Sequence, residues 1–311
     1  MSLPVFDGHC DTAVELYRRN MSLRENTLSV SLRRAEKLKG YAQFFAFCTV
    51  WMQDELSAEE RYSRFRSAFV KQIEANADRV TLCRSASDAE SAVAANKAAA
   101  FLSIEGGEAI GCDPDRLEAA KKQGISMISL TWNHENALCG SCLTGSGLTD
   151  RGREFCRTAQ QLGIVLDVSH LSDRGFFELC EISAKPIVAS HSDSRSVCAH
   201  PRNLTDEQFL TLCQLNGAAG INLYSRFLRE DGAAGIDDVY RHIDRFLELG
   251  GDGHVCLGAD FDGCDTTPEG LGGIDDYVNL EEYLRQRGYS EKTLYDLFFG
   301  TWMRVIRECV M

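Results

Sequence analysis

Residues 5–12, Val5-Phe6-Asp7-Gly8-His9-Cys10-Asp11-Thr12, have the pattern of a short buried β-strand that ends in His-x-Asp. In an extended chain alternate side chains share a face, so His9 and Asp11 should point the same way and Cys10 the opposite way, into the outer layer of the fold. An imidazole and a carboxylate side by side at a strand end can hold a divalent metal ion. Two polar residues that merely close a strand would give the same pattern, so its meaning depends on the rest of the chain.

Seven further stretches have the apolar composition of strands buried on both faces of a parallel sheet. Helix signals stand between several of them, including capping boxes at 57–60 and 205–208 and a helix start at Asp113-Pro114. The predicted strands are 41–50, 99–105, 126–132, 163–170, 186–191, 218–223 and 255–260. Eight strands alternating with helices predict an α/β fold, a single (β/α)8 TIM barrel over residues 1–311, with closing helices from about residue 279. An open doubly wound sheet is the alternative, but it gives no reason for polar residues at the same end of so many strands.

Composition narrows the classes of partner. The chain has 311 residues, of which 44% are hydrophobic, and a net charge of -13, which disfavours nucleic acid and anionic membranes as partners. No apolar run approaches the ~20 residues that span a bilayer, and no basic region precedes an apolar segment as in a signal peptide. Thirteen cysteines, an odd number at irregular spacing, are typical of a reducing compartment. We therefore expect a cytoplasmic protein with neither nucleic acid nor membrane as a partner.

In such a barrel the functional groups lie at the carboxyl ends of the strands. The predicted strand ends carry three histidines and three carboxylates, namely His9, Asp11, Glu105, His170, His191 and Asp260. A catalytic zinc ion takes about three protein ligands plus water, so this set exceeds what one ion needs. It suits two ions about 3.5–4 Å apart, which would activate a shared water for hydrolysis without a nucleophilic side chain. The mixture of nitrogen and carboxylate donors favours zinc, with manganese or cobalt as alternatives.

Five segments, in this order, resemble the renal (membrane) dipeptidase family, a branch of the amidohydrolase superfamily. They are Asp7-Gly8-His9-Cys10-Asp11, Glu105-Gly106-Gly107, Asp167-Val168-Ser169-His170, Ser190-His191-Ser192 with Arg202-Asn203 downstream, and Gly258-Ala259-Asp260-Phe261-Asp262-Gly263. The resemblance covers residue 5 to about residue 263, with helices beyond, and it implies a TIM barrel of the metal-dependent hydrolase type. It implies a zinc-dependent dipeptidase that hydrolyses dipeptides, L-Xaa-D-Xaa among them, by attack of a metal-bridged hydroxide, and it implies a homodimer.

The resemblance also implies which residue holds which metal ion. His9 and Asp11 would bind the first of two Zn²⁺ ions, His170 and His191 would bind the second, and Glu105 would bridge them. In other branches of the superfamily a carboxylated lysine stands where Glu105 stands here.

Three further residues would act on the substrate. Asp260 would be the general base that takes a proton from the water and passes it to the leaving amine, the alternative being a carboxylate that only orients a ligand histidine. Arg202, eleven residues after His191, would bind the substrate carboxylate through its planar guanidinium, unless it is a surface arginine. Tyr224 would either line the same pocket or belong to the core.

One segment departs from the family pattern. The family often has a substrate-binding histidine directly after Leu-Thr on the fourth strand, whereas here Leu130-Thr131 is followed by Trp132-Asn133-His134. We expect His134 to bind the substrate from two residues further on, with Trp132 or Asn133 as the alternatives.

The remaining cysteine and histidine motifs have simpler interpretations. Cys139 and Cys142 form a CxxC pair that could be redox-active or half of a zinc site, but no second CxxC completes a four-thiolate set, so two free thiols are expected. His242 and His254 are expected to be structural.

Two other functions remain open on the sequence. The nearer is a different binuclear amidohydrolase activity, on a lactone, a phosphoester or a cyclic amide. The more distant is a non-catalytic metal-binding protein, which would need neither Asp260 nor an open coordination position.

Overall fold

Strand β1 (Val5–Cys10) lies between β2 (Tyr41–Cys48) and β9 (Val255–Leu257), and both pairings are parallel. The computed structural model describes residues 3–52 and 54–310. Within them the strand order is β2-β1-β9-β8-β7-β6-β5-β4, and β2 also pairs with β4 along seven residues, which closes the sheet. The (β/α)8 barrel is thereby confirmed, because an open doubly wound sheet would leave β2 and β4 as separate edges.

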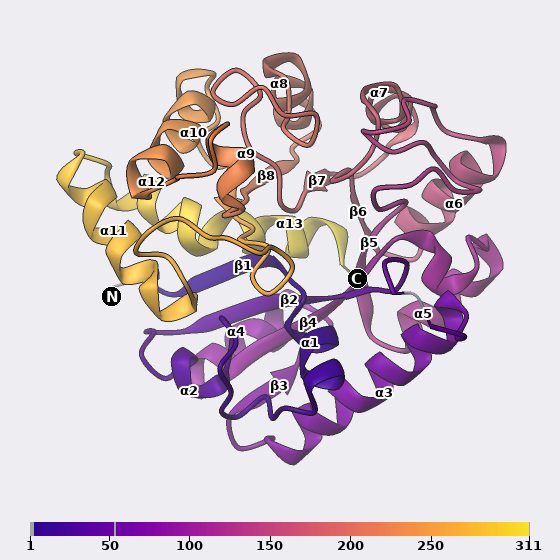
Figure 1. The fold of residues 1–311 in the computed structure, drawn as a ribbon, viewed down its shortest axis with the longest axis horizontal. Helices are drawn as coiled ribbons and strands as arrows, with labels where there is room; N and C mark the ends of the chain where they lie inside the picture. The colour runs from indigo at the N-terminus through magenta and orange to yellow at the C-terminus, as the bar shows by residue number, and fades with distance from the viewer. Residues whose placement is uncertain (1–2, 53, 311) are drawn as a thin grey trace.

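The other strands are β3 (Val80–Leu82), β4 (Ala98–Glu105), β5 (Ile125–Ser129), β6 (Val165–Asp167), β7 (Ile187–Ala189) and β8 (Ala218–Ile221). The helices encircle them (Figure 1). They are α1 (Thr12–Arg19), α2 (Leu32–Ala35), α3 (Ala58–Ala75), α4 (Ala86–Ala94), α5 (Leu117–Lys122), α6 (Asp150–Gln161), α7 (Asp173–Ile182), α8 (Asp206–Gln214), α9 (Ser225–Leu228), α10 (Ile236–Glu248), α11 (Tyr277–Gln286), α12 (Glu291–Tyr295) and α13 (Thr301–Cys309), with short 3-10 turns η1 (Gly107–Ile110), η2 (Pro114–Arg116) and η3 (Ile274–Asp276) and a π turn η4 (Asp296–Gly300).

Local signals account for most of these boundaries. Both predicted capping boxes form: the side chains of Ser57 and Thr205 accept hydrogen bonds from the backbone N–H groups of Glu60 and Gln208. Gly124 adopts a φ of +97° directly after α5, a conformation that favours glycine at a helix end. The closing helices begin with α11 at Tyr277, two residues before the predicted point.

Two details differ from the sequence prediction. The additional strand β3 pairs with the start of β4, on the edge whose other half pairs with β5. It has only three residues, too few for a periodic pattern to reveal it. The strands β6, β7 and β9 are also shorter than predicted and end before His170, His191 and Asp260, so these three residues lie on the loops that follow the strands.

The carboxyl-terminal helix α13 closes the amino-terminal end of the barrel. Its Trp302 is fully buried, packs on Phe6 and Phe44 near the strand starts, and donates a hydrogen bond from Nε1 to the carbonyl of Leu257 at 2.8 Å. Gly8 makes room for the indole, since a Cβ there would lie 2.1 Å from it. With one end filled in this way, the opposite end of the barrel is the one that can take a ligand.

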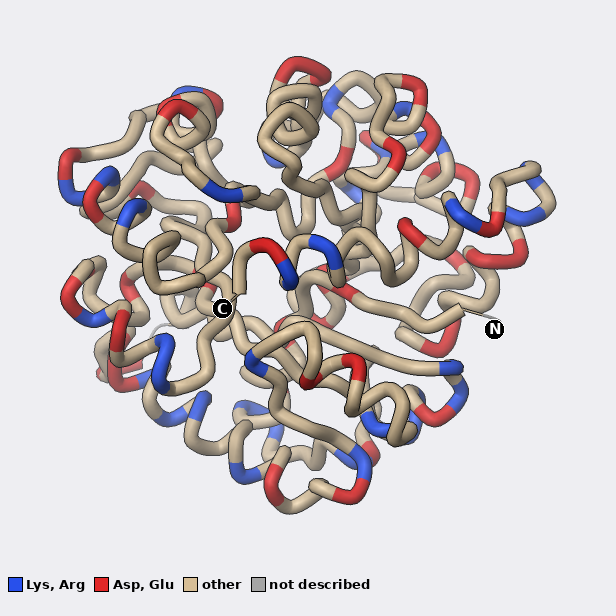
Figure 2. Tube along the Cα trace, turned by 180° about the vertical axis from the view of Figure 1, so that it is seen from behind, with Lys and Arg blue, Asp and Glu red and all other residues tan. Residues whose placement is uncertain are grey.

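Charged residues of both signs are interspersed over the surrounding helices and loops (Figure 2). No helix in residues 3–52 or 54–310 combines the length and apolarity needed to cross a bilayer.

Candidate metal centre

Three carboxylate side chains converge around the imidazole of His9. Its Nε2 lies 3.5 Å from Asp11 Oδ2, 3.6 Å from Glu105 Oε2 and 3.9 Å from Asp260 Oδ1. These distances are too long for good hydrogen bonds, and His9 Nε2 is buried with no hydrogen-bond partner among the described residues. Two donor atoms that each lie about 2.1 Å from one tetrahedral ion are about 3.4 Å apart. The spacing around His9 therefore fits a shared cation.

A second group of donors lies beside the first. His170 Nε2 is 2.8 Å from Glu105 Oε1 and 3.0 Å from His191 Nε2, and His191 Nε2 is 3.6 Å from the same Glu105 oxygen. The two oxygens of Glu105 thus face different groups: Oε2 faces His9, and Oε1 faces the two other histidines. All six residues belong to three-member donor groups whose ligand atoms lie within 4.8 Å of one another. The donor set fits two cations that share one carboxylate.

Hydrogen bonds from outside the centre fix both histidines on this side. The Nδ1 of His191 is 2.7 Å from Ser190 Oγ, which donates to Asp167 Oδ2 at 2.6 Å. The Nδ1 of His170 is 3.0 Å from Asn133 Oδ1, an oxygen that can only accept, so His170 donates and its Nε2 is left free of a proton. Partners of this kind set the tautomer and ring orientation of metal-binding histidines.

The backbone carries strain at two of these positions. His170 has a φ of +74° and Asp260 a φ of +62°, values that cost a non-glycine residue about 1–3 kcal/mol. The strain is held by hydrogen bonds, since Cys142 N donates to the carbonyl of His170 at 2.7 Å and Asp260 N donates to that of His9 at 3.1 Å. These turns aim both side chains at the mouth of the barrel.

The protonation equilibria reflect the crowding of charged groups. Burial raises the pKa of Asp11 to about 7 and that of Asp260 to about 6, and the Glu105 carboxylate adds to both shifts. Burial lowers the pKa of His170 to about 4. For His9 burial acts in the same downward direction, but the neighbouring carboxylates of Glu105 and Asp11 outweigh it and raise the pKa. Cations placed among these groups would relieve the repulsion between the carboxylates.

Asp260 is held by Asn222, which follows β8 and is fully buried. Asn222 Nδ2 donates to Asp260 Oδ2 at 3.1 Å and to the carbonyl of His191 at 3.3 Å, while its Oδ1 accepts from Tyr224 N at 2.6 Å. One carboxylate oxygen of Asp260 is therefore engaged, and the other faces His9. The sequence analysis did not find Asn222, because its role depends on the spatial adjacency of β8 and β9.

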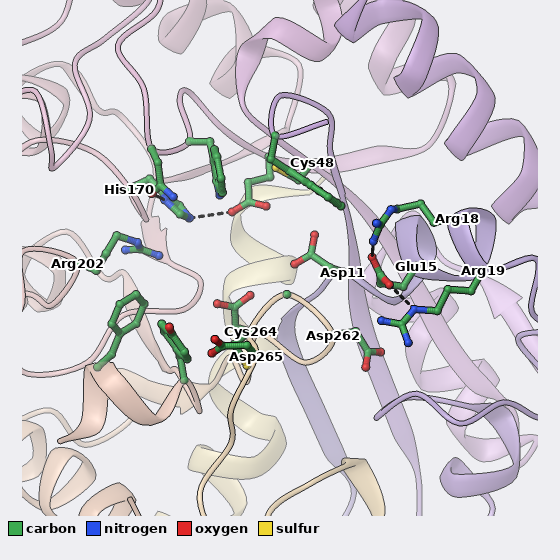
Figure 3. Close-up of a pocket in the computed structure, with 18 residues that line it drawn as sticks. Asp11, Glu15, Arg18, Arg19, Cys48, His170, Arg202, Asp262, Cys264 and Asp265 are labelled. Carbon is green, nitrogen blue, oxygen red and sulfur yellow. Dashed lines mark hydrogen bonds and ion pairs between the residues drawn. The ribbon is translucent and has the colours of Figure 1, made fainter. Parts of the chain in front are cut away.

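Arg202 is not a surface residue: only 6% of it is exposed. It donates from Nη1 to Ser192 Oγ at 3.2 Å and from Nη2 to the carbonyl of His191 at 3.3 Å, and its Nε is buried without a partner among the described residues. Its guanidinium lies 5.6 Å from the ring centre of Phe227 and lines the same pocket as Asp260 and Tyr224 (Figure 3).

The structure does not place His134 in this pocket. Its side chain is exposed, because the chain turns after Trp132 so that Thr131 Oγ1 donates to the carbonyl of His134. Trp132 and Asn133, the two alternatives in this loop, both line the cavity, which has a volume of about 480 Å³. Positions 132 and 133, and not 134, are therefore the ones in this segment that line the cavity.

The other histidines and cysteines singled out in the sequence lie outside the centre. His242 is fully buried, accepts from Ser194 N at 3.0 Å and donates to the carbonyl of Leu228 at 3.0 Å, as expected of a structural residue. His254 Nδ1 lies 2.8 Å from the carbonyl of Gly217. Cys139 and Cys142 are free thiols, and Cys10 is buried in the outer layer between strands and helices.

Comparisons with known proteins agree with this geometry. The profile of the membrane dipeptidase family, peptidase family M19, matches residues 1–310. A Klebsiella pneumoniae protein known only as an uncharacterised protein of the pqqA 5′ region is 34% identical over 254 residues, which are 78% of this chain and 93% of that protein.

Two solved structures are similar along their whole length. The crystal structure of dipeptidase AC, a family M19 metallopeptidase, has a TM-score of 0.90 and 29% identity, covering 100% of this chain and 99% of its own. A Rhodobacter sphaeroides metallopeptidase with a phosphinate mimic of the dipeptide L-Ala-D-Ala has a TM-score of 0.89 and 28% identity, covering 99% of this chain and 100% of its own.

Proposed function

The chain belongs to the membrane dipeptidase family, peptidase family M19, and is a metal-dependent hydrolase of the dipeptidase type; from this premise we propose that it cleaves L-Xaa-D-Xaa and related dipeptides with two zinc ions. The observation that carries the proposal is the division of Glu105 between two groups of donors. A single ion on one oxygen of Glu105 would leave the donor group at the other oxygen without a cation.

We assign His9 and Asp11 to one ion, His170 and His191 to the other, and Glu105 to both. Two cations in these places would supply a water of lowered pKa and polarise the substrate carbonyl. Imidazole and carboxylate donors support zinc, and the same donors can also bind manganese or cobalt.

Asp260 is proposed as the general base. It accepts the proton of the attacking water at the oxygen that faces His9, and it returns a proton to the leaving amine. Burial raises its pKa to about 6, which makes it a stronger base than an exposed aspartate. The amide of Asn222 holds the other oxygen and keeps the carboxylate in one orientation.

Arg202 is proposed to bind the carboxylate of the substrate. Its hydrogen bonds to Ser192 and His191 are long, its Nε has no partner in residues 3–52 or 54–310, and its guanidinium lines the cavity, so it can form a bidentate pair with a planar carboxylate. Such a buried cation supports a dipeptidase over lactone, phosphoester or cyclic-amide hydrolysis, because those substrates have no free α-carboxylate to match it.

The stereochemical preference and the cellular location are also part of the proposal. The Rhodobacter sphaeroides relative was crystallised with a mimic of L-Ala-D-Ala, which supports a D-residue at the carboxyl-terminal position. All thirteen cysteines are free, which supports a reducing location such as the cytoplasm.

The test is a panel of L-Xaa-D-Xaa and L-Xaa-L-Xaa dipeptides incubated with zinc-loaded protein, with amino acid release as the readout. We expect release from several dipeptides and none with Asp260→Asn, which keeps the size of the side chain. A protein that holds two ions and releases nothing from any dipeptide would refute the proposal, and would favour a metal-binding protein without catalysis.

A further inference from the structure

The cavity extends beyond the metal centre to a second cationic end. Arg202 lies at one end, the metal-binding residues lie in the middle, and Arg18 and Arg19 of α1 lie at the other end (Figure 3). A dipeptide whose carboxylate reaches Arg202, and whose scissile carbonyl reaches the metal centre, has its amino-terminal residue on the side of α1. The second cationic end therefore faces the amino-terminal side chain of the substrate.

The side chain of Arg18 is held in place at this end. Its guanidinium lies 4.5 Å from the ring centre of Trp51, and its Nη1 forms an ion pair with Glu15 Oε1. Arg19 Nε is 2.6 Å from the other oxygen of Glu15. Trp51 and Glu15 also line the cavity, and Glu15 is buried while the two arginines are exposed.

The two arginines at this end have more guanidinium N–H groups than Glu15 takes up, since each donates from one nitrogen to it. Two guanidinium groups share the single carboxylate of Glu15. The other carboxylate nearby, Asp262, already accepts hydrogen bonds from Thr12 Oγ1 at 2.6 Å and Ser29 N at 2.8 Å. Arg18 has guanidinium N–H groups beyond the one on Glu15, and a further carboxylate is the chemical group that they suit.

We propose that Arg18, supported by Arg19 and Trp51, forms a subsite for an acidic side chain on the amino-terminal residue of the dipeptide. Asp11 directly precedes α1, and the Cα of Arg18 lies about 10 Å along the helix from it, at about 1.5 Å per residue. The subsite rests on the proposed dipeptidase function and names a substrate class for it.

The test compares L-Glu-D-Ala with L-Gln-D-Ala, which differ only in the charge of the amino-terminal side chain. A charge-assisted hydrogen bond at a partly exposed site corresponds to about a tenfold difference in kcat/KM in favour of the glutamyl substrate. In Arg18→Gln/Arg19→Gln the ratio should fall to about one, mainly through turnover of the glutamyl substrate. Arg33→Gln, at an exposed position on α2, should leave the ratio unchanged.

Binding gives a second readout that does not depend on turnover. Phosphinate analogues of the same two dipeptides should differ about tenfold in Kd for the unaltered protein. The double variant should bind both analogues with about the same Kd. Equal kcat/KM for both substrates in the unaltered protein, or a preference that survives in the double variant, would overturn the subsite while leaving the dipeptidase function intact. Failure to hydrolyse any dipeptide would overturn both.

Discussion

Removing the guanidinium of Arg202 should abolish the distinction between a free and a blocked substrate carboxylate. The substitution Arg202→Met keeps an apolar side chain over Phe227 but deletes the charged donors. A bidentate pair contributes two charge-assisted hydrogen bonds of about 1.5–3 kcal/mol each, so a total of roughly 3–6 kcal/mol is at stake. That corresponds to a loss of about 10²–10⁴ in kcat/KM for a dipeptide.

The assay uses L-Ala-D-Ala and its carboxyl-terminal amide, which has the same shape but no negative charge. The unaltered protein should favour the free dipeptide by about two to four orders of magnitude, whereas Arg202→Met should treat the two alike because it slows only the charged substrate. Arg241→Met, at an exposed position on α10, is the matched control. If Arg202→Met lowers kcat/KM equally for both substrates, the arginine supports the loop structure and does not bind the carboxylate.

Three further predictions concern the base, a buried histidine and the barrel closure. Asp260→Asn should lower kcat by at least about 10² without loss of bound metal, because only proton transfer is removed; metal analysis beside kinetics checks this, and unchanged kcat would exclude the role. The pKa of His242 is lowered to about 4 by burial from a usual 6.5, so in this interval the unfolded state binds more protons and stability falls as the pH falls from about 6.5 to about 4. Denaturation of the metal-free protein and of His242→Gln should show about 3 kcal/mol more acid destabilisation in the former, and parallel curves would contradict the assignment. Trp302→Ala should lower the free energy of unfolding by about 3–5 kcal/mol, since it empties the closed end of the barrel; a loss below about 1 kcal/mol in urea titrations would show that α13 is not the closure.

The barrel and the convergence of the six candidate metal ligands could be predicted because both depend on local patterns. The two-residue period of an extended chain puts His9 and Asp11 on one face, and apolar runs mark the other strands. Strand β3 was not predicted because its three residues are too few to show an alternating hydrophobic pattern. The predicted ends of β6 and β9 lie too late in the chain, because His170 and Asp260 follow the apolar runs closely in the sequence. Both residues have a left-handed backbone, which does not belong to a strand.

The side chains that line the cavity were harder to predict than the candidate metal ligands. His134 was expected in the pocket, but the direction of the loop after Trp132 is set by hydrogen bonds that the order of residue types does not encode. Asn222 and Arg18 reach the site through neighbouring elements, one beside β9 and one along α1. Contacts of this kind depend on which elements are neighbours in the folded barrel, and the sequence pattern of a single element does not give that.

Stepwise zinc titration of the metal-free protein, with hydrolysis of L-Ala-D-Ala measured at each step, tests the central claim most directly. The division of Glu105 between two donor groups predicts that activity rises mainly as the second ion binds and reaches its maximum at two ions per chain, and that His9→Ala retains one ion with negligible activity. Full activity at one ion per chain, or no hydrolysis with two ions bound, would contradict it.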